Sequence, residues 1–188
     1  MNQLEITGIS SDAEFEINRS MPGFSNDFNE FVIAHNIDVS QLQLIKRIEL
    51  IEAYLYSRPD SLKADFFPVN HQFSGGVYAR EFFLPKGYMV VGKVHKGDHF
   101  LACTIGDCTM TTQYGSQRVT AHYLEQAKSG TKRIVFAHED TVLVTFHKTD
   151  LDGSNIEAVE NEIAENSDIT WIEDAKNAKK HLEAGVVL

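Results

Sequence analysis

Short apolar segments separated by turn residues recur about every ten residues through the middle of this chain, between positions 66 and 148. Expected strands cover 77–84, 88–94, 100–105, 108–113, part of 118–127, 133–137 and 142–147. Turn-forming groups such as Pro85-Lys86-Gly87 and His138-Glu139-Asp140 lie between them. Many short strands at this spacing are typical of an antiparallel sandwich, barrel or jelly roll. The sequence therefore predicts a mainly β domain over residues 66–150.

Helical patterns precede this β-rich region. Ser25 is in place to cap a first helix. Asp38, followed three residues later by Gln41, forms a capping-box pattern before a second helix, which should end at Arg58-Pro59 because the residue before proline avoids helical backbone angles. We therefore expect an N-terminal helical segment over residues 1–65.

Helical patterns also follow the β-rich region. Capping-box patterns begin at Ser154 and Thr170, and residues 151–188 are predicted to form acidic C-terminal helices that pack on the barrel or on a partner. Positions 150–174 contain nine carboxylates and no lysine or arginine. The simplest interpretation is a solvated helical face. The alternative is an acidic surface that binds a basic partner protein or imitates nucleic acid.

Composition excludes several classes of function. A net charge of −10 argues against a protein that binds the nucleic-acid backbone. The longest apolar runs, such as Val142 to Phe146, have the length of a strand and not of a membrane span. No signal peptide is visible at the N-terminus, and there are only two cysteines, Cys103 and Cys108. We expect a cytoplasmic protein with two buried, reduced thiols. The apolar stripes of its helices favour a homodimer.

Two histidines flank a tight turn between apolar segments. His95 and His99 lie on either side of Lys96-Gly97-Asp98, so one ends a strand and the other begins the next. Both side chains are expected at the mouth of the barrel, where neutral imidazoles would suit Fe, Ni, Mn or Zn. The alternative is a pair of polar histidines that are hydrogen-bonded at the rim.

A third metal ligand is less well defined by the sequence. His147 has the same side-chain parity as Leu143 and Thr145 in an apolar strand, and this parity is consistent with a side chain that faces the pocket. A hydrogen-bonded histidine at the strand edge is the alternative. Other candidates are His71, Asp98 and Glu81. His138, in a turn, is expected to be exposed and outside the site.

The β region from about Val77 to Lys148 resembles the cupin superfamily of small barrels. The first cupin motif runs Gly, five residues, His-x-His, three or four residues, Glu, six residues, Gly. When its last glycine is placed on Gly106, His99 falls on the glutamate, His95 on the second histidine and Lys93 on the first. In the second motif Gly130 matches, whereas Arg133 stands where the family has histidine.

Four stretches are similar to cupin-like proteins carried by bacteriophages; they are Gly75 to Glu81, Leu84 to Gly87, Gly92 to His95 and Gly130 to Arg133. This likeness covers about residues 66–165. It implies a cupin-type jelly-roll barrel with flanking helices. It also implies metal-dependent oxygenation, isomerisation or lyase chemistry as the reactions that such barrels commonly support, and host cytoplasm as the location.

Two cations replace expected metal ligands. Lys93 and Arg133 would suit an anionic or small polar ligand, since arginine offers a planar fork to carboxylate or phosphate. The alternative is a structural ion pair of Arg133 with Glu81 or Glu139. Arg80 and Glu81 are adjacent in a strand, so only one of them faces inward, and both are ligand-binding candidates.

Three functions follow from these patterns. The first is a small-molecule-binding cupin-like protein with a divalent metal at the barrel mouth, and it includes the possibility of an enzyme. The second is a non-enzymatic accessory protein that binds a host or phage protein through its acidic helices. The third is a structural oligomer component.

Overall fold

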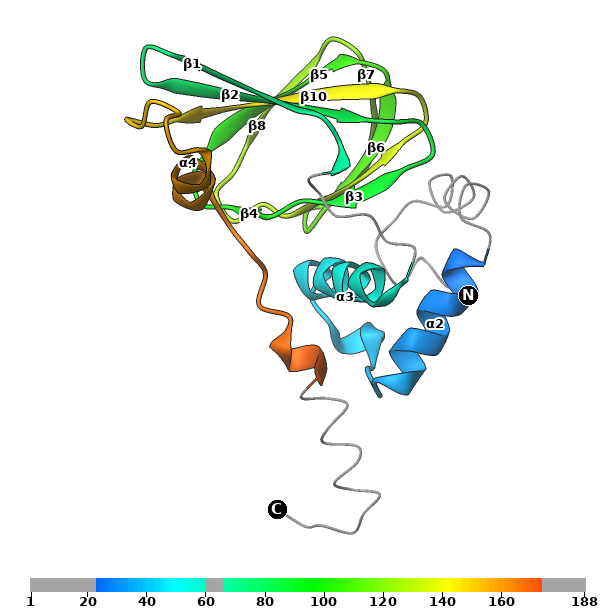
Figure 1. The fold of residues 1–188 in the computed structure, drawn as a ribbon. Helices are drawn as coiled ribbons and strands as arrows, with labels where there is room; N and C mark the ends of the chain where they lie inside the picture. The colour runs from blue at the N-terminus through cyan, green and yellow to red at the C-terminus, as the bar shows by residue number, and fades with distance from the viewer. Residues whose placement is uncertain (1–22, 60–65, 174–188) are drawn as a thin grey trace.

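The computed structural model describes residues 23–59 and 66–173, and its centre is a β-barrel with helices on one side and at one end (Figure 1). The strands are β1 (Val69–Ser74), β2 (Val77–Leu84), β3 (Met89–Val91), β4 (Val94–His95), β5 (His99–Ile105), β6 (Asp107–Thr112), β7 (Gly115–Thr120), β8 (Tyr123–Ala127), β9 (Arg133–Ala137), β10 (Thr141–Lys148) and β11 (Ala164–Glu165). The helices are α2 (Phe24–Ala34), the 3₁₀ helix η1 (Val39–Gln41), α3 (Leu44–Ser57) and α4 (Ile156–Ile163).

Two antiparallel sheets face each other to form the barrel. One sheet has the order β1-β2-β10-β5-β8 and the other β3-β9-β6-β7, and β4 pairs with β11 in a separate two-stranded ladder. Without the additional edge strand β1, the facing sheets are β2-β10-β5-β8 and β3-β9-β6-β7, which is the strand order of an eight-stranded jelly roll. The predicted fold class, a mainly β jelly-roll barrel with flanking helices, is therefore confirmed.

Strand β9 is buried on both faces and separates two apolar cores. Val135 and Ala137 point into the barrel and pack with residues of both sheets, such as Met110 and Leu143. The alternate residues Ile134 and Phe136 point out of the barrel and pack against the helices. The period of two along a strand thus gives β9 one face in each core.

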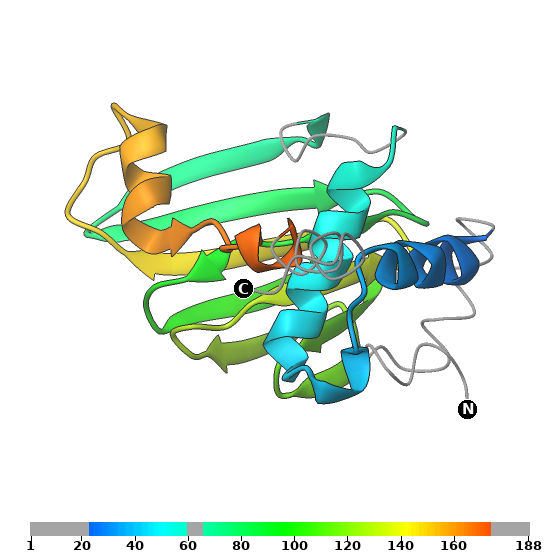
Figure 2. The same ribbon diagram turned by 90° about the horizontal axis from the view of Figure 1, so that it is seen from below.

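The helical layer covers the outer face of the sheet that contains β9. Helix α3 crosses beneath this sheet, and α2 packs beside α3 (Figures 1 and 2). Phe24 and Phe28 of α2 both make edge-to-face contacts with Tyr54 of α3, with ring centroids 5.4 Å apart in each pair. These contacts bury the apolar stripe that the sequence predicted for each helix.

The predicted starts of the two N-terminal helices are wrong. Helix α2 is preceded by Gly23, which has a φ of 86°, and Ser25 lies inside the helix. The Asp38 side chain does accept a hydrogen bond from the Ser40 N–H, but it caps the short η1 helix, and α3 begins only at Leu44. The predicted end of α3 at Arg58 is confirmed.

A buried lysine links the helices to the barrel. Lys132 is fully buried, and its Nζ donates to the Gly92 carbonyl oxygen at 2.9 Å and lies 3.0 Å from Glu52 Oε2 of α3. Glu52 is itself buried, with 8% of its surface exposed. Each charge of this ion pair therefore compensates the other, because both side chains are removed from water.

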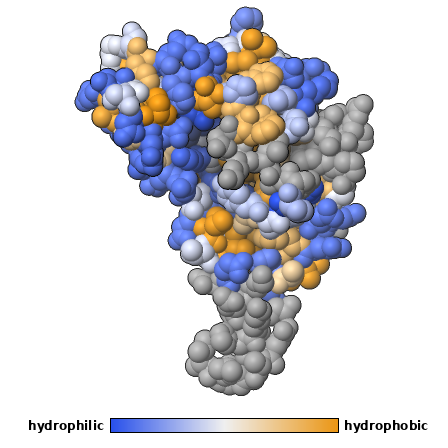
Figure 3. Space-filling model, viewed as in Figure 1, coloured by the Kyte–Doolittle hydropathy of each residue, from blue (hydrophilic) through white to orange (hydrophobic). Residues whose placement is uncertain are grey.

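Helix α4 closes the end of the barrel beside β1 and β2, where Val159 and Ile163 pack on Tyr78 and Phe73. Asn155, and not Ser154, caps this helix by accepting from the Ala158 N–H at 3.0 Å. Hydrophilic side chains dominate the surface around α4 (Figure 3). A further helical turn begins at Thr170, and its predicted continuation lies outside the described residues.

Several carboxylates of the acidic stretch have partners within the chain. Glu160 lies 3.5 Å from both Arg80 Nε and Lys93 Nζ. Glu162 accepts a hydrogen bond from the Thr149 hydroxyl, and Asp168 accepts one from the Thr170 hydroxyl at 2.6 Å. These contacts give part of the stretch a structural role, and its role in binding a partner stays a prediction.

Most strand predictions are confirmed, and three details differ. Residues 118–127 contribute to two strands, β7 and β8, and the segment 88–94 is divided between β3 and β4. Strands β1 and β11 were not predicted individually. Within the part of the chain that the structure describes, no helix has both the length and the apolar character needed to cross a membrane.

Candidate metal centre

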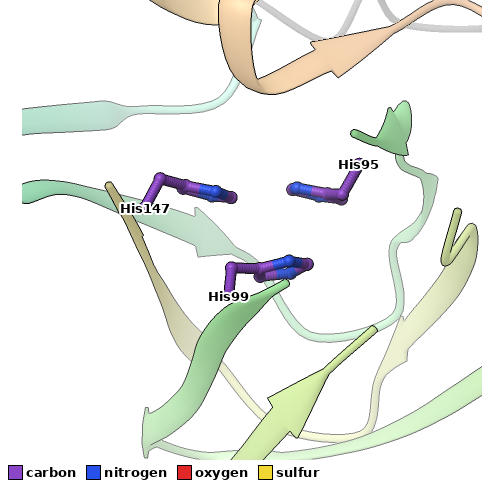
Figure 4. Close-up of side chains that lie close together, drawn as sticks. All are labelled: His95, His99 and His147. Atoms are coloured by element: carbon purple, nitrogen blue, oxygen red, sulfur yellow. The ribbon is translucent and has the colours of Figure 1, made fainter. Parts of the chain in front are cut away.

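Three histidines from three different strands meet at one end of the barrel (Figure 4). His95 ends β4, His99 begins β5, and His147 lies near the end of β10. The ring centroids are 4.1 Å apart for His95 and His99, 4.7 Å for His99 and His147, and 5.1 Å for His95 and His147. The structure thus brings together His95, His99 and His147, three of the residues that the sequence suggested as metal ligands.

Strand pairing places His99 and His147 side by side. Strands β5 and β10 are antiparallel neighbours with Phe100 opposite Phe146, so His99 and His147 are the next pair along the ladder. Alternation points the two histidines to the barrel interior, on the side of Leu101, whereas Phe100 and Phe146 face outward. Both histidines are buried, with 3% and 4% of their surface exposed.

His95 is held by backbone contacts on both sides of its short strand. Its N–H donates to the Thr131 carbonyl at 3.2 Å, and its carbonyl accepts from the Gly130 N–H at 2.7 Å. On the other side it pairs with Ala164 of β11. The turn that follows is fixed by Asp98, which accepts from the Ser129 N–H at 2.9 Å. Because these contacts fix its backbone, His95 is held opposite the other two rings.

Each of the three rings has a nitrogen that is buried and free of hydrogen bonds. These atoms are His95 Nδ1, His99 Nε2 and His147 Nε2, and none has a partner among the residues that the structure describes. The second nitrogen of His99, Nδ1, lies 3.1 Å from the Gly97 carbonyl oxygen and must donate to it. This donation leaves the lone pair of His99 Nε2 free, which is how metal-bound histidines are commonly oriented.

Burial keeps the three imidazoles neutral. It is the main cause that lowers the pKa of His95 to about 2 and that of His147 to about 4, and the neighbouring histidines lower both further. Burial also lowers the pKa of His99, although its hydrogen bond to Gly97 opposes the shift. A neutral imidazole offers a lone pair, and this is the form that binds a metal ion.

The cluster fits a divalent transition metal. Buried nitrogens without partners cost free energy, and one cation among the three would compensate all of them. One ring nitrogen from each histidine lies within 4.8 Å of those of the other two. Two nitrogens bound to one zinc ion at about 2.0–2.1 Å in tetrahedral geometry lie about 3.4 Å apart. The three rings would therefore have to move closer together to hold one ion.

Two arginines lie beside the histidines. Arg80 is on the inward face of β2, and its charge lowers the pKa of His147. Arg133, at the start of β9, lowers the pKa of both His95 and His99. Each is balanced by a carboxylate: Arg80 Nε lies 3.5 Å from Glu160, and Arg133 Nη2 donates to Glu125 Oε1 at 2.7 Å. Because of this pairing, the two cations repel a metal ion less than their number suggests.

Lys93 and Glu81 lie outside the cluster. The Lys93 side chain is exposed and lies beside Glu160 on the surface. Glu81 alternates with the inward residues Arg80 and Phe82, so it is on the outer face of β2. Of the four ligand-binding candidates, the structure places Arg80 and Arg133 next to the histidines. The ion pair of Arg133 is with Glu125 and not with Glu81 or Glu139.

The other suggested metal ligands have different surroundings. His71 Nδ1 lies 2.6 Å from the Tyr78 hydroxyl, and Asp98 forms its contacts at the exposed turn. His138 is not exposed as expected: it is 8% exposed, and its Nε2 lies 2.7 Å from the Thr109 hydroxyl. The predicted burial of Cys103 and Cys108 is confirmed, and the two do not form a disulfide in the structure.

Three polar residues of this barrel end were not predicted. Glu125 pairs with Arg133, and Tyr78 lies opposite His147 in the ladder of β2 and β10. Burial raises the pKa of Tyr78 to about 12, so it remains a neutral phenol. The third is Thr145, whose buried hydroxyl has no hydrogen-bond partner in the described ranges. Side-chain parity within a correctly placed strand is the signal that would have found them.

A pocket of about 310 Å³ shares Arg133 and Glu125 with this end of the barrel. Its lining includes Arg133 and Glu125, together with Met110 and side chains of β7 and β8. The volume is at the lower end of the range for small-molecule sites, about 300–1,000 Å³. The barrel end therefore combines a cluster of neutral imidazoles with a cavity that has a buried arginine in its wall.

Comparisons with known proteins find similarity only in solved structures. No protein-family model matches the sequence, and no curated protein matches it. Ectoine synthase from P. lautus shares 11% identity, over 56% of this chain and 83% of that chain, with a TM-score of 0.44. A cupin superfamily protein from Desulfitobacterium hafniense shares 11% identity, over 47% and 83% of the two chains, with a TM-score of 0.40. A cupin 2 conserved barrel domain protein from Leptotrichia buccalis shares 12% identity, over 50% and 46%, with a TM-score of 0.41.

Proposed function

We propose that this protein holds one divalent transition metal at His95, His99 and His147 and binds a small polar or anionic ligand beside it. The observation that carries this proposal is the cluster of three rings: each has a buried nitrogen without a hydrogen-bond partner among the described residues, and one ring nitrogen of each lies within 4.8 Å of the others. A hydrogen-bonded group of rim histidines, which is the alternative, would have satisfied these atoms.

The donor set suggests which metals would bind. Three imidazole nitrogens suit Zn, Fe and Ni better than Mn, which prefers carboxylate and water oxygens. Three protein ligands also leave a coordination position open for a ligand molecule. When bound, the metal would supply Lewis-acid polarisation of an oxygen atom of that molecule. The chain itself would orient His99 through Gly97 and place the charges of Arg80 and Arg133 nearby.

We further infer that the barrel is of the cupin type, similar to the cupin-like proteins of bacteriophages. The support is the position of the motif residues: His95 and His99 fall on ligand positions of the first motif, and both side chains are in the cluster. Arg133 falls on the histidine position of the second motif and lies beside them. His147 would then provide the ligand that the arginine cannot provide.

Metal analysis of the full-length, untagged chain tests the proposal. The protein is stripped with a chelator and reloaded separately with Zn²⁺, Fe²⁺, Ni²⁺ and Mn²⁺, and its metal content is measured by ICP-MS. About one equivalent should bind to the wild type and be lost in His99→Ala and His147→Ala. His122→Asn is a matched control because His122 is exposed and lies in a turn, and asparagine tolerates its φ of 71°. No binding to the wild type, or equal binding to His99→Ala, would refute the proposal.

A further inference from the structure

The pocket lies where the two sheets of the barrel meet. Strand β7 is at the edge of one sheet and β8 at the edge of the other. Side chains connect these strands: Gln117 of β7 donates to the Tyr123 hydroxyl at 2.7 Å and lies 3.4 Å from Glu125 Oε2. The pocket of about 310 Å³ is lined by residues of both edge strands, with Arg133 and Met110 from the interior.

Arg133 is the buried cation of this pocket, and much of its hydrogen-bonding capacity is unused. Only 7% of its side chain is exposed, and Nη2 donates to Glu125 Oε1 at 2.7 Å. Its Nε and Nη1 atoms are buried and have no partner among residues 23–59 and 66–173. An unpaired N–H of a buried guanidinium is costly, so an acceptor that enters the pocket would be bound strongly.

Glu125 does not satisfy these atoms in the structure. One of its oxygens already accepts from Arg133, and the other accepts from the Tyr123 hydroxyl at 2.8 Å and lies near Gln117. Both carboxylate oxygens are therefore engaged in fixed directions. Arg133 is held in place by Glu125, while its Nε and Nη1 keep N–H groups without a partner among the described residues.

We propose that this pocket binds the carboxylate of a small organic acid, with Arg133 Nε or Nη1 as donor. The proposal rests on the function proposed above, because it names the class of ligand for the same barrel end. The charges in the wall favour a singly charged group over a phosphate dianion. Arg133 is paired with Glu125, and Lys128 with Asp98 at 3.2 Å, so the pocket has little net positive charge.

Calorimetric titration with benzoate and benzamide tests the pocket directly. The two probes have the same shape and differ in charge, and inorganic phosphate is the third probe. Benzoate should bind the wild type at least about 10-fold more tightly than benzamide, because a hydrogen bond to a charged group contributes that much. Arg133→Gln should lose this preference. Arg118→Gln is the matched control, since Arg118 makes its ion pair with Asp107 on the exposed surface.

Titrations of the metal-free and the zinc-loaded protein separate the two proposals. A preference for benzoate without any metal binding would leave the acid pocket standing and overturn the metal centre. Metal binding with equal affinity for benzoate and benzamide would overturn the pocket only, as would an unchanged preference in Arg133→Gln. The absence of detectable binding of either probe to the wild type would also overturn the pocket.

Tighter binding of phosphate than of benzoate would overturn the choice of a carboxylate as the ligand class. The comparison of the two probes on the wild type stands even if Arg133→Gln fails to fold.

Discussion

The imidazole rings of His95 and His147 are parallel, with an interplanar angle of 1° and centroids 5.1 Å apart. His95 is on β4, which pairs with β11, whereas His147 is on β10 in the middle of the five-stranded sheet. The two rings therefore come from separate ladders and meet only in the folded barrel. A metal bound by both would cross-link these ladders.

Metal binding should therefore stabilise the folded protein. A metal at 100 times its dissociation constant adds about 2.7 kcal/mol to the free energy of unfolding. For a chain of this size we expect a rise in Tm of about 5–10 °C. Differential scanning fluorimetry of the metal-free protein with added Zn²⁺ measures this rise. The rise in Tm should disappear in His147→Ala and persist in His122→Asn. A similar rise in both variants would contradict the proposal that His147 is a metal ligand.

The metal-free protein should lose stability as the pH falls below about 6.5. The pKa of His95 is lowered to about 2 and that of His147 to about 4, so the folded state takes up these protons far less readily than the unfolded state. Each histidine that stays neutral then reduces the free energy of unfolding by up to about 1.4 kcal/mol per pH unit below 6.5. Urea denaturation at pH 7, 6 and 5 measures this slope. It should be shallower in His95→Gln, and an equal slope in that variant would show that His95 is not held neutral.

The ion pair of Lys132 and Glu52 should behave as a coupled unit. Glu52→Gln removes the carboxylate and leaves the fully buried ammonium of Lys132 with the Gly92 carbonyl, which should cost about 3–5 kcal/mol. Lys132→Met combined with Glu52→Gln should cost less than the sum of the two single changes. Urea denaturation of the four proteins completes the double-mutant cycle. Additive losses would show that the two residues do not interact.

Gly106, at the turn between β5 and β6, should not tolerate a side chain. Its φ is 92°, and a Cβ atom there would lie 2.3 Å from the Asp140 carbonyl oxygen. Gly130 also has a positive φ, 76°, but nothing lies within 4 Å of a Cβ atom at that position. Gly130→Ala should therefore cost only about 1–2 kcal/mol of backbone strain, and Gly106→Ala clearly more. Equal losses in thermal or urea denaturation would contradict the predicted clash.

The sequence predicts the barrel well where local signals agree. Strand β2 has the predicted bounds, since Pro85-Lys86-Gly87 ends a run of apolar and aromatic residues. The division of residues 118–127 was missed because the chain turns at His122, which adopts a φ of 71° without a glycine to indicate it. The start of α3 was missed for a similar reason: a good local cap at Asp38 was used by a 3₁₀ turn.

The site was only partly predictable because it depends on pairing between distant strands. His95 and His99 lie on either side of one turn, so their proximity is a local property. The choice of His147 over His71 requires the register of β10 against β5, which no short segment encodes. Glu125 was missed because its strand was not delimited, and without the strand bounds the direction of its side chain cannot be assigned.

Strand β9 also bears on how this protein can be dissected. Ile134 and Phe136 are each 2% exposed because the helices before the barrel cover them. A shortened chain that begins at Phe66 would turn both side chains toward water and leave Lys132 without Glu52. The strand contributes one face to the core inside the barrel and the other face to the core with the helices, so each core depends on the other. We therefore expect that the barrel does not fold without these helices, and that the site, to which β9 contributes Arg133, can be transferred to another protein only together with them.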